Sequence, residues 1–306
     1  MGPNLLELSN ICDNNLDEIT IINITIELIK NMELIHNANI LHSDIKPDNI
    51  CYGNLSSGDK KELIKINLID FGNSILYKIK NQLIAHKYNN KPLCTREYSS
   101  LNVLRGETFS RRDDLESIIY VAIQLYKNKL PWDDIKHYCI GSIAIDNKAK
   151  LYKDSNSNSQ NLIKSKIKNI IDKNEKKERL DIDELIFVHQ NLSFEEICEG
   201  MPKEYLIVYE LIKKLSYREK PNYSLIIDIF EKAKIRILHE KKNEIYSSLN
   251  FGNTIYKFKW EYLFNDLIIY DKIDNLKNYN EALSNFEKRY CLNLKKYFEE
   301  IQKCYK

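Results

Sequence analysis

The chain has 306 residues, of which 43% are hydrophobic, so it is long enough to bury a sizeable core in one large domain or two smaller ones. Its 46 basic and 44 acidic residues nearly cancel to a net charge of +2, and this balance gives no reason to expect a nucleic acid or membrane partner. Because no stretch approaches about 20 uninterrupted apolar residues, and the first residues lack a basic segment followed by an apolar run, we expect neither a transmembrane helix nor a signal peptide.

The cysteine, glycine and proline contents indicate the cellular compartment and the fold class of the protein. The seven cysteines are scattered, with no C-x-x-C pair and no zinc-like spacing, which favours reduced thiols in the cytoplasm or nucleus. The chain contains only 8 Gly and 6 Pro, and this scarcity favours helices over strand-and-turn architectures.

The first predicted element is a long amphipathic helix over residues 17–37. Asp17 can cap its N-terminus, because a carboxylate there accepts hydrogen bonds from free backbone N–H groups. Apolar side chains then recur at helical spacing, at Ile22, Ile26, Ile29 and Met32.

A loop and a short strand follow this helix. Residues 41–50, LHSDIKPDNI, contain too many Asp and Pro residues to be regular. A β-rich run from Ile66 to Ile69 ends at Asp70-Phe71-Gly72. Residues 73–110 carry mixed charge and predict mostly irregular structure.

The second half of the chain is predicted to be helical. Residues 113–127 form an apolar helix that Leu130-Pro131-Trp132 stops. Residues 146–160, rich in Asn, Ser and Lys, indicate a flexible insert. The remaining predicted helices cover 161–174, 204–217, 222–240 and a charged amphipathic tail at 275–306. The apolar stripe of that tail either packs onto the domain or binds a partner protein.

The residues that carry chemistry lie in two motifs about twenty residues apart: His42-Ser43-Asp44-Ile45-Lys46-Pro47-Asp48-Asn49 and Asp70-Phe71-Gly72. Phosphoryl transfer needs a carboxylate that accepts the proton of the acceptor hydroxyl, a cation near the transferred phosphate, and hard oxygen ligands for Mg²⁺. Asp44, Lys46, Asn49 and Asp70 supply these groups in the required order. The two motifs together predict an ATP-dependent phosphotransferase, although either alone is weak.

These motifs resemble the C-terminal lobe of a serine/threonine protein kinase, and several stretches are most similar to the casein kinase I group. The stretches are MGPNLLEL (1–8), DIKPDNI (44–50), TREYSSLN (95–102), SRRDDLES (110–117), LPW (130–132), ICEGMPKEY (197–205) and KPNYSLI (220–226). The resemblance implies a mainly α fold, a kinase C-lobe with short β-hairpins around the catalytic loop. It covers residues 1–240, continues weakly through 241–264, and leaves 265–306 as a charged helical tail.

The resemblance also implies a role for each matching position. Asp44 matches the catalytic base and Lys46 the catalytic-loop lysine. Asn49 and Asp70 match the metal ligands, so ATP and Mg²⁺ are the expected cofactors. The supporting positions are His42 under Phe71 in the hydrophobic spine, Asp114 as a buried acceptor for the catalytic-loop backbone, and Leu5 or Leu6 near an adenine pocket. Arg111 and Arg112 are expected to be structural.

The largest departure from the family is the missing N-terminal lobe. In the family, a Gly-rich loop and a strand lysine precede the MGP segment, but here that segment starts the chain, and no G-x-G-x-x-G sequence occurs anywhere. We therefore expect a truncated record of a longer kinase, with weak binding of Mg-ATP by these 306 residues alone. The surface that faces the absent lobe is then partly exposed and available to a protein partner.

Three smaller departures concern individual positions in the motifs, five residues in all. Ser43 replaces the Arg that meets a phosphorylated activation loop, so no switch of that kind is expected. Glu97 occupies the position of an activation-segment arginine, and Asp133 and Asp134 follow Trp132 where the family is neutral. A preference for phosphorylated substrates is therefore in doubt, because carboxylates repel phosphate. Asn73 follows Asp-Phe-Gly where the family has an apolar residue.

Three functions remain open from the sequence. The first is a casein kinase I-like enzyme acting on Ser or Thr of a protein substrate, in the cytoplasm or nucleus. The second is a pseudokinase or interaction module, favoured by the missing nucleotide clamps and the acidic substitutions. The third is an enzyme similar to the vaccinia-related kinases, a sister group that the SRRDDLES and KPNY stretches fit less well.

Overall fold

The computed structural model describes residues 3–52, 66–80, 82–88, 94–133, 165–166, 168–170, 172–173 and 179–240. The predicted insert at 146–160, the weakly similar segment 241–264 and the predicted tail at 265–306 lie outside the described residues.

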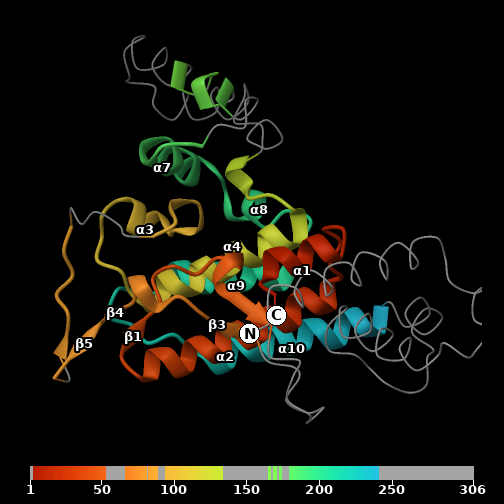
Figure 1. The fold of residues 1–306 in the computed structure, drawn as a ribbon, viewed down its shortest axis with the longest axis horizontal. Helices are drawn as coiled ribbons and strands as arrows, with labels where there is room; N and C mark the ends of the chain where they lie inside the picture. Colours follow the sequence, from red (N-terminus) through yellow and green to blue (C-terminus); the bar gives the residue numbers. More distant parts are fainter. Residues whose placement is uncertain are drawn as a thin grey trace, which may run out of the picture.

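The described part is mainly helical, as predicted (Figure 1). Its α-helices are α1 (Leu5–Ile11), α2 (Glu18–Asn37), α3 (Leu101–Leu104), α4 (Arg111–Lys127), α7 (Ile182–Asn191), α8 (Phe194–Ile197), α9 (Lys203–Lys214) and α10 (Tyr223–Glu240). Short 3₁₀ turns occur at η1 (Pro47–Asn49), η2 (Phe71–Asn73), η3 (Arg96–Tyr98) and η4 (Pro131–Asp133). The strands are β1 (Ile40–Leu41), β2 (Ile50–Tyr52), β3 (Ile66–Leu68), β4 (Ile75–Leu76), β5 (Lys78–Ile79) and β6 (Gln82–Leu83).

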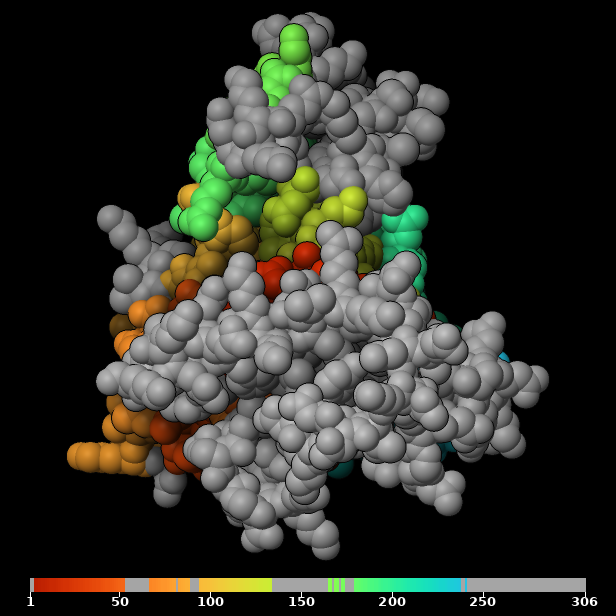
Figure 2. All heavy atoms as spheres, turned by 45° about the vertical axis from the view of Figure 1, so that its right-hand side comes forward, coloured from red at the N-terminus to blue at the C-terminus, as the bar shows by residue number. Residues whose placement is uncertain are grey.

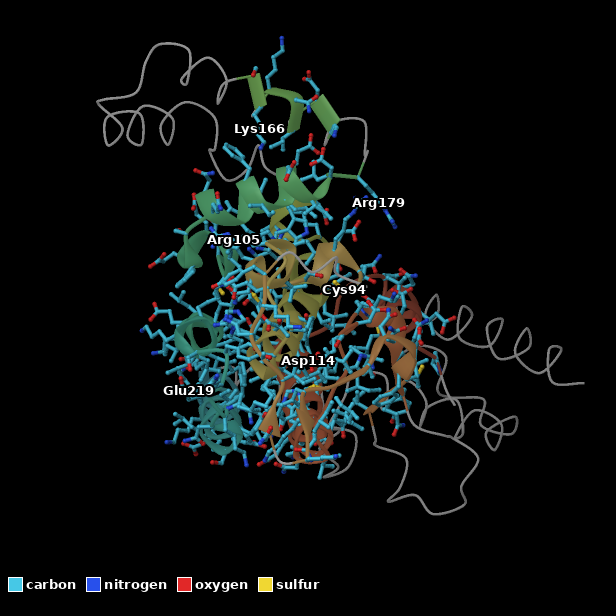
Figure 3. The ribbon with its side chains drawn as sticks, turned by 90° about the vertical axis from the view of Figure 1, so that its left-hand side faces the viewer. Cys94, Arg105, Asp114, Lys166, Arg179 and Glu219 are labelled. Atoms are coloured by element: carbon cyan, nitrogen blue, oxygen red, sulfur yellow. The ribbon has the colours of Figure 1, made fainter. Side chains whose placement is uncertain are left out.

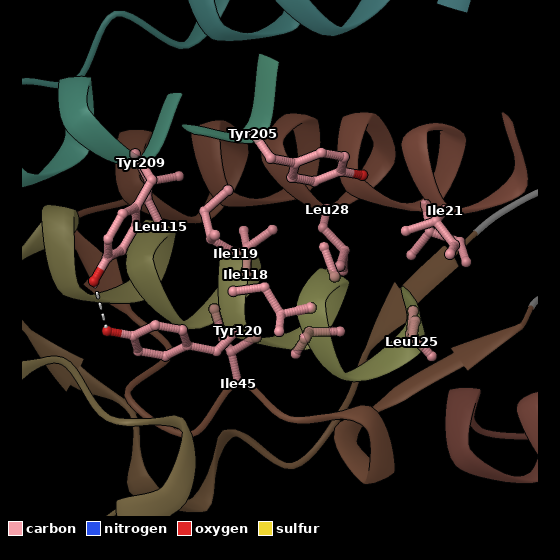
Figure 4. Close-up of a cluster of buried hydrophobic side chains, with 14 of the residues drawn as sticks. Ile21, Leu28, Ile45, Leu115, Ile118, Ile119, Tyr120, Leu125, Tyr205 and Tyr209 are labelled. Carbon is pink, nitrogen blue, oxygen red and sulfur yellow. Dashed lines mark hydrogen bonds between the residues drawn. The ribbon is translucent and has the colours of Figure 1, made fainter. Parts of the chain in front are cut away.

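Helices α2 and α4 form the centre of the core, with α9 and α10 packed against them. Figure 4 shows side chains of α2, α4 and α9 meeting in one apolar cluster, with Leu28 and Ile119 fully enclosed. Each such side chain stabilises the fold by about 1.5–3 kcal/mol relative to exposure. This buried centre gives the surrounding loops a rigid base.

Polar bonds inside the core fix how the helices sit against one another. Thr25 Oγ1 of α2 lies 3.1 Å from Tyr205 Oη of α9. Lys213 Nζ of α9 donates to Glu116 Oε1 of α4 at 3.0 Å, and the Glu116 side chain is 1% exposed. Since an unpaired buried charge is costly, these pairs favour one packing over its alternatives.

The prediction of a helix over 17–37 is confirmed by α2. The Asp17 carboxylate caps the helix by accepting from Thr20 N at 2.9 Å, and the predicted apolar stripe is buried. Helix α4 begins at Arg111, two residues before the predicted start, because Ser110 and Asp113 form a capping box at its N-terminus. Predicted helices 204–217 and 222–240 correspond to α9 and α10, and the described residues of 161–174 are helical.

The prediction that residues 73–110 are mostly irregular missed several short elements. The range contains β4, β5, β6, η3 and α3 among its described residues. Strands of only two residues carry no readable alternation of apolar and polar side chains. Helix α3 has four residues and depends on its Ser100 cap. The sequence pattern was too short in each case to reveal the element.

The strands pair as three antiparallel two-stranded sheets, β1–β4, β2–β3 and β5–β6. The β2–β3 pair aligns Ile50 with Leu68 and Tyr52 with Ile66, and β1–β4 aligns Leu41 with Ile75. These pairs bring three stretches of the chain close together. They are the stretch that follows β1, the stretch that precedes β2 and the stretch that follows β3. This convergence brings the two sequence motifs into one site.

Helix α7 lies at one end of the described part, next to α3. In Figure 2 the green atoms of this region stand above the amber atoms that carry α3. Within the ranges that the structure describes, no helix has both the length and the apolar character needed to cross a bilayer. Cys12, Cys51, Cys94 and Cys198 are free thiols.

Candidate active site

The candidate site forms where the chain leaves β1 and returns through β3. Residues 42–46 connect β1 to η1, and Asn49 ends η1 immediately before β2. The N–H of Ile69, directly after β3, donates to the carbonyl of Asn49 at 2.9 Å. This bond holds Asp70 beside the loop that carries Asp44, so the structure brings together the two motifs.

Asp44 is buried and surrounded by hydrogen-bond donors. Its Oδ1 accepts from Thr95 Oγ1 at 2.7 Å and from Thr95 N at 2.9 Å. Its Oδ2 accepts from Lys46 Nζ at 3.1 Å and Asn49 Nδ2 at 3.3 Å. Burial raises the pKa of Asp44, but the bonds from Thr95 and Lys46 outweigh burial and hold the pKa below its ordinary value. Asp44 is therefore an anion at neutral pH.

Lys46 lies between the catalytic loop and the segment before η3. Its ammonium donates to Asp44 Oδ2 and, at 2.9 Å, to Thr95 Oγ1. The side chain is 24% exposed, so it is only partly enclosed by the protein. This placement leaves a positive charge available next to the Asp44 carboxylate.

Asn49 and Asp70 present hard oxygen atoms, which suit Mg²⁺. Asn49 Nδ2 donates to the carbonyl of Asp44 at 2.9 Å, so its amide nitrogen is held by the loop. Asp70 is exposed and has a left-handed backbone with φ of 59°. Its Oδ1 accepts from Gly72 N at 3.2 Å. The oxygen donors of Asn49 and Asp70 are of the type that fits Mg²⁺.

Asn73, the residue after Asp-Phe-Gly, reaches the same carboxylate. Its Nδ2 lies 3.5 Å from Asp44 Oδ2, which is at the long limit of a hydrogen bond. The next residue, Ser74, donates through Oγ to the carbonyl of His42 at 3.2 Å. Asn73 and Ser74 thus connect η2 to the catalytic loop by polar contacts, where an apolar residue at position 73 would offer no donor.

His42 and Phe71 pack together behind the site. Their ring centroids are 4.9 Å apart with a tilt of 55°, and His42 Nε2 lies 3.0 Å from the carbonyl of Ile69. The Phe71 side chain remains 45% exposed. The contact joins the two motifs through an aromatic pair.

Asp114 supports the catalytic loop from helix α4. Its carboxylate is fully buried and accepts from Ser43 N at 2.9 Å and from His42 N at 3.0 Å. It also lies 2.9 Å from His36 Nε2. Figure 3 shows Asp114 in the middle of the lobe. Asp114 therefore positions the backbone of His42 and Ser43, which directly precedes Asp44.

Leu5 and Leu6, considered as adenine contacts, take different places on α1. Leu5 is fully buried in the core, whereas Leu6 is 42% exposed. Leu6 lines a cavity of about 230 Å³ together with Pro47 and residues of α1 and the end of α4. Neither Asn49 nor Asp70 lines that cavity. Helix α1 itself packs against η1, the turn that ends with Asn49, and the role of the two leucines stays a prediction.

Three acidic residues, Asp48, Glu97 and Asp133, lie near Tyr98. Burial raises the pKa of Tyr98, and the charges of Asp48, Asp133 and Glu97 raise it further. Glu97 Oε1 also lies 3.6 Å from Arg179 Nε and 3.7 Å from Arg96 Nε. Asp133 accepts from Leu130 N at 2.8 Å, and Asp134 lies outside the described residues.

Arg111 and Arg112, expected to be structural, both donate to backbone carbonyls near the end of α9. Arg111 Nη2 donates to Arg218 O at 2.7 Å, and Arg112 Nη1 donates to Leu215 O at 2.9 Å. Arg112 Nη2 also lies 3.1 Å from Glu107 Oε2. These bonds hold the start of α4 against the turn before α10.

Reasoning from the sequence missed two residues that complete the site. Thr95 supplies two of the hydrogen bonds to Asp44, and His36 joins Asp114 to Tyr223 Oη, 2.6 Å from His36 Nδ1. Thr95 begins the TREYSSLN stretch, so a motif did mark it. His36 lies within the helix pattern and carries no local sign of its role.

A comparison with protein-family models agrees with this geometry. The model described as "Protein kinase domain" matches residues 4–189. The match spans both motifs, helix α4 and the acidic positions around Tyr98. It ends in α7, before α8, α9 and α10.

Thr95→Val tests the origin of the low Asp44 pKa. The change removes the Oγ1 bonds to Asp44 and Lys46 but keeps the backbone N–H, so the pKa of Asp44 should rise toward its ordinary value. Because a depressed carboxyl pKa stabilises the fold above the unfolded pKa and that stability is lost as pH falls, the variant should be less stable at neutral pH and should lose less stability on acidification. Carboxyl ¹³C NMR titration measures the pKa. Thr108→Val is the control, and an unchanged titration of Asp44 would contradict the assignment.

Asp114→Asn tests the support of the catalytic loop. An amide has one acceptor oxygen and faces three donors, so buried N–H groups lose partners, and we expect a loss of about 3 kcal/mol in the free energy of unfolding. Urea denaturation measures this loss. Asp228→Asn, which breaks an exposed pair with Lys232, should cost less than about 1 kcal/mol. Equal effects of the two changes would argue against a special role for Asp114.

Proposed function

The chain belongs to the protein kinase family, and on this premise we propose that it is a casein kinase I-type enzyme that transfers the γ-phosphate of ATP to Ser or Thr of a protein. The observation that carries the proposal is the environment of Asp44. A buried carboxylate with a lowered pKa stands beside the Lys46 ammonium and the Thr95 hydroxyl. That arrangement suits a group that orients a hydroxyl and takes its proton.

The reaction assigns one task to each polar residue. Asp44 accepts the proton of the substrate hydroxyl as the hydroxyl oxygen bonds to the γ-phosphorus and the bond to the bridging oxygen of ATP breaks. Lys46 places its charge next to the reacting oxygens. Asn49 and Asp70 hold Mg²⁺, which supplies neutralisation of the phosphate charge when bound. Thr95 orients Asp44, and Asn73 adds a long contact to the same carboxylate.

On this proposal, the Gly-rich loop and the strand lysine come from sequence outside residues 1–306. The support is that no G-x-G-x-x-G occurs in the chain. A single misplaced charge clamp lowers the rate by about 10²–10³-fold. We therefore expect residues 1–306 alone to bind Mg-ATP weakly.

A second function is favoured by the exposed apolar surface beside the site. Phe71, Ile75 and Leu76 are each more than one third exposed, although large apolar side chains are usually buried. An interaction module or pseudokinase would use this surface for a protein partner. Calorimetry with Mg-ATP separates the two functions, because a catalytic chain regains binding when an N-terminal lobe is joined to it and an interaction module does not.

Asp44→Asn and Asp70→Ala test the assigned roles in a chain joined to a kinase N-terminal lobe. Each change should abolish phosphate transfer to a Ser/Thr peptide, because the first removes the proton acceptor and the second a metal ligand. Transfer of ³²P from labelled ATP measures the activity. Asp13→Asn, at an exposed turn far along the chain from both motifs, should retain activity. Full activity in either site variant would refute its role.

Glu97→Arg tests whether the acidic surroundings of Tyr98 disfavour phosphorylated substrates. Replacing an anion by a cation should raise kcat/KM for a phosphorylated peptide, relative to its unphosphorylated form, by about threefold or more. The ratio is measured in the same joined chain. Glu210→Arg, on the exposed face of α9, is the control and should leave the ratio unchanged. A ratio unaffected by Glu97→Arg would exclude this residue from substrate selection.

A further inference from the structure

A second cavity lies at the base of the lobe, where α2 ends and α4 and α10 begin. Its volume is about 200 Å³. It is lined by His36, Asn37, Asn39, Tyr77, Lys78, Arg111, Lys220 and Tyr223. None of the residues that we assign to the reaction lines it.

The cavity has an excess of positive charge, from Arg111, Lys78 and Lys220. Arg111 is only 9% exposed, and a buried guanidinium is normally paired with an anion. Its charge lies over the Tyr77 ring, 4.8 Å from the centroid. One of its five N–H groups donates to the carbonyl of Arg218. Within the part of the chain that the structure describes, no carboxylate forms an ion pair with any of the three cations.

Two nearby carboxylates, Asp114 and Glu219, are used elsewhere, and a third, Glu33, lies close enough for its charge to act on the lining residue Tyr223. Asp114 lies one helical turn after Arg111, but its oxygens accept from His36, His42 and Ser43. Glu219 precedes Lys220 and accepts from Ser216 N at 3.1 Å within its own turn. Figure 3 places Glu219 at the edge of the lobe and Asp114 in its interior. Neither lines the cavity.

We propose that this cavity binds a phosphate group, either free phosphate or a phosphate monoester. A planar guanidinium with free N–H donors matches the oxygens of a phosphate, and lysines add charge without demanding a fixed direction. The order of exposure fits an entry path, because Lys220 is exposed, Lys78 is half-buried and Arg111 is buried. Tyr223 and Asn39 add neutral polar groups to the lining.

The cavity is joined to the catalytic loop through His36. This side chain lines the cavity and lies 2.9 Å from the Asp114 carboxylate, which holds the backbone of His42 and Ser43. An anion bound at Arg111 therefore acts on the loop through one side chain and one carboxylate. The proposal itself concerns binding and stands independently of phosphotransfer.

The test is a phosphate titration of the full chain with ¹⁵N-labelled arginine, at constant ionic strength with chloride as the replaced anion. The Nε–Hε signal of Arg111 should shift and saturate with inorganic phosphate. Lys78→Met and Lys220→Met each remove one charge from the lining without touching Arg111, and each should weaken the affinity about threefold. Circular dichroism checks that both variants fold.

Lys232→Met is the matched control, since Lys232 lies on α10 in an exposed pair with Asp228 and does not line the cavity. It should leave the affinity unchanged. An Arg111 signal that does not saturate, or an equal loss of affinity in all three lysine variants, would overturn the proposal.

Phenyl phosphate and a phosphoserine peptide then distinguish the sources of the phosphate. Tighter binding of the peptide than of free phosphate identifies a phosphorylated protein segment as the ligand. Equal binding identifies a site for the free ion. Both results support a phosphate site, whereas binding of the unphosphorylated peptide with equal affinity would contradict it.

Discussion

The buried carboxylate of Asp114 is the contact on which the candidate site depends. It projects from the central helix α4 and accepts from two consecutive backbone N–H groups of the catalytic loop and from His36 of α2. A buried anion of this kind is stable only when each of its oxygens is satisfied. The hydrophobic packing of α2 against α4 therefore sets the position of the catalytic loop. The position of Asp44 depends on this packing, because Asp44 lies on that loop.

The long helices and the two motifs that carry the candidate catalytic residues were predictable from the sequence. Helix α2 has a carboxylate cap and an apolar stripe sustained over five turns, so its existence and bounds followed from periodicity. The roles of Asp44, Lys46, Asn49 and Asp70 came from residue types at fixed spacing and from the resemblance. The structure brings these residues together at the ends of paired short strands, and the kinase subgroup remains part of our proposal.

The local sequence pattern did not predict the elements and contacts that depend on residues far apart in the chain. Helix α1 has seven residues and relies on the Asn4 capping box and on burial of Leu5 and Leu8 in a core built largely by later residues. The contact of Thr95 with Asp44 spans 51 residues, and that of His36 with Asp114 spans 78. A periodicity analysis over a short window contains no information on such pairs. The cavity beside Arg111 likewise assembles from four separate segments.

The way Asp114 holds the loop has an evolutionary consequence at position 43. Ser43 has a left-handed backbone, with φ of 67°, which is unfavourable for most residues. The bond that stabilises this conformation comes from its backbone N–H, which every residue except proline possesses. The conformation of the loop is thus encoded at position 114. Any residue other than proline that fits the buried space at position 43 would keep this backbone bond, and with it the geometry beneath Asp44.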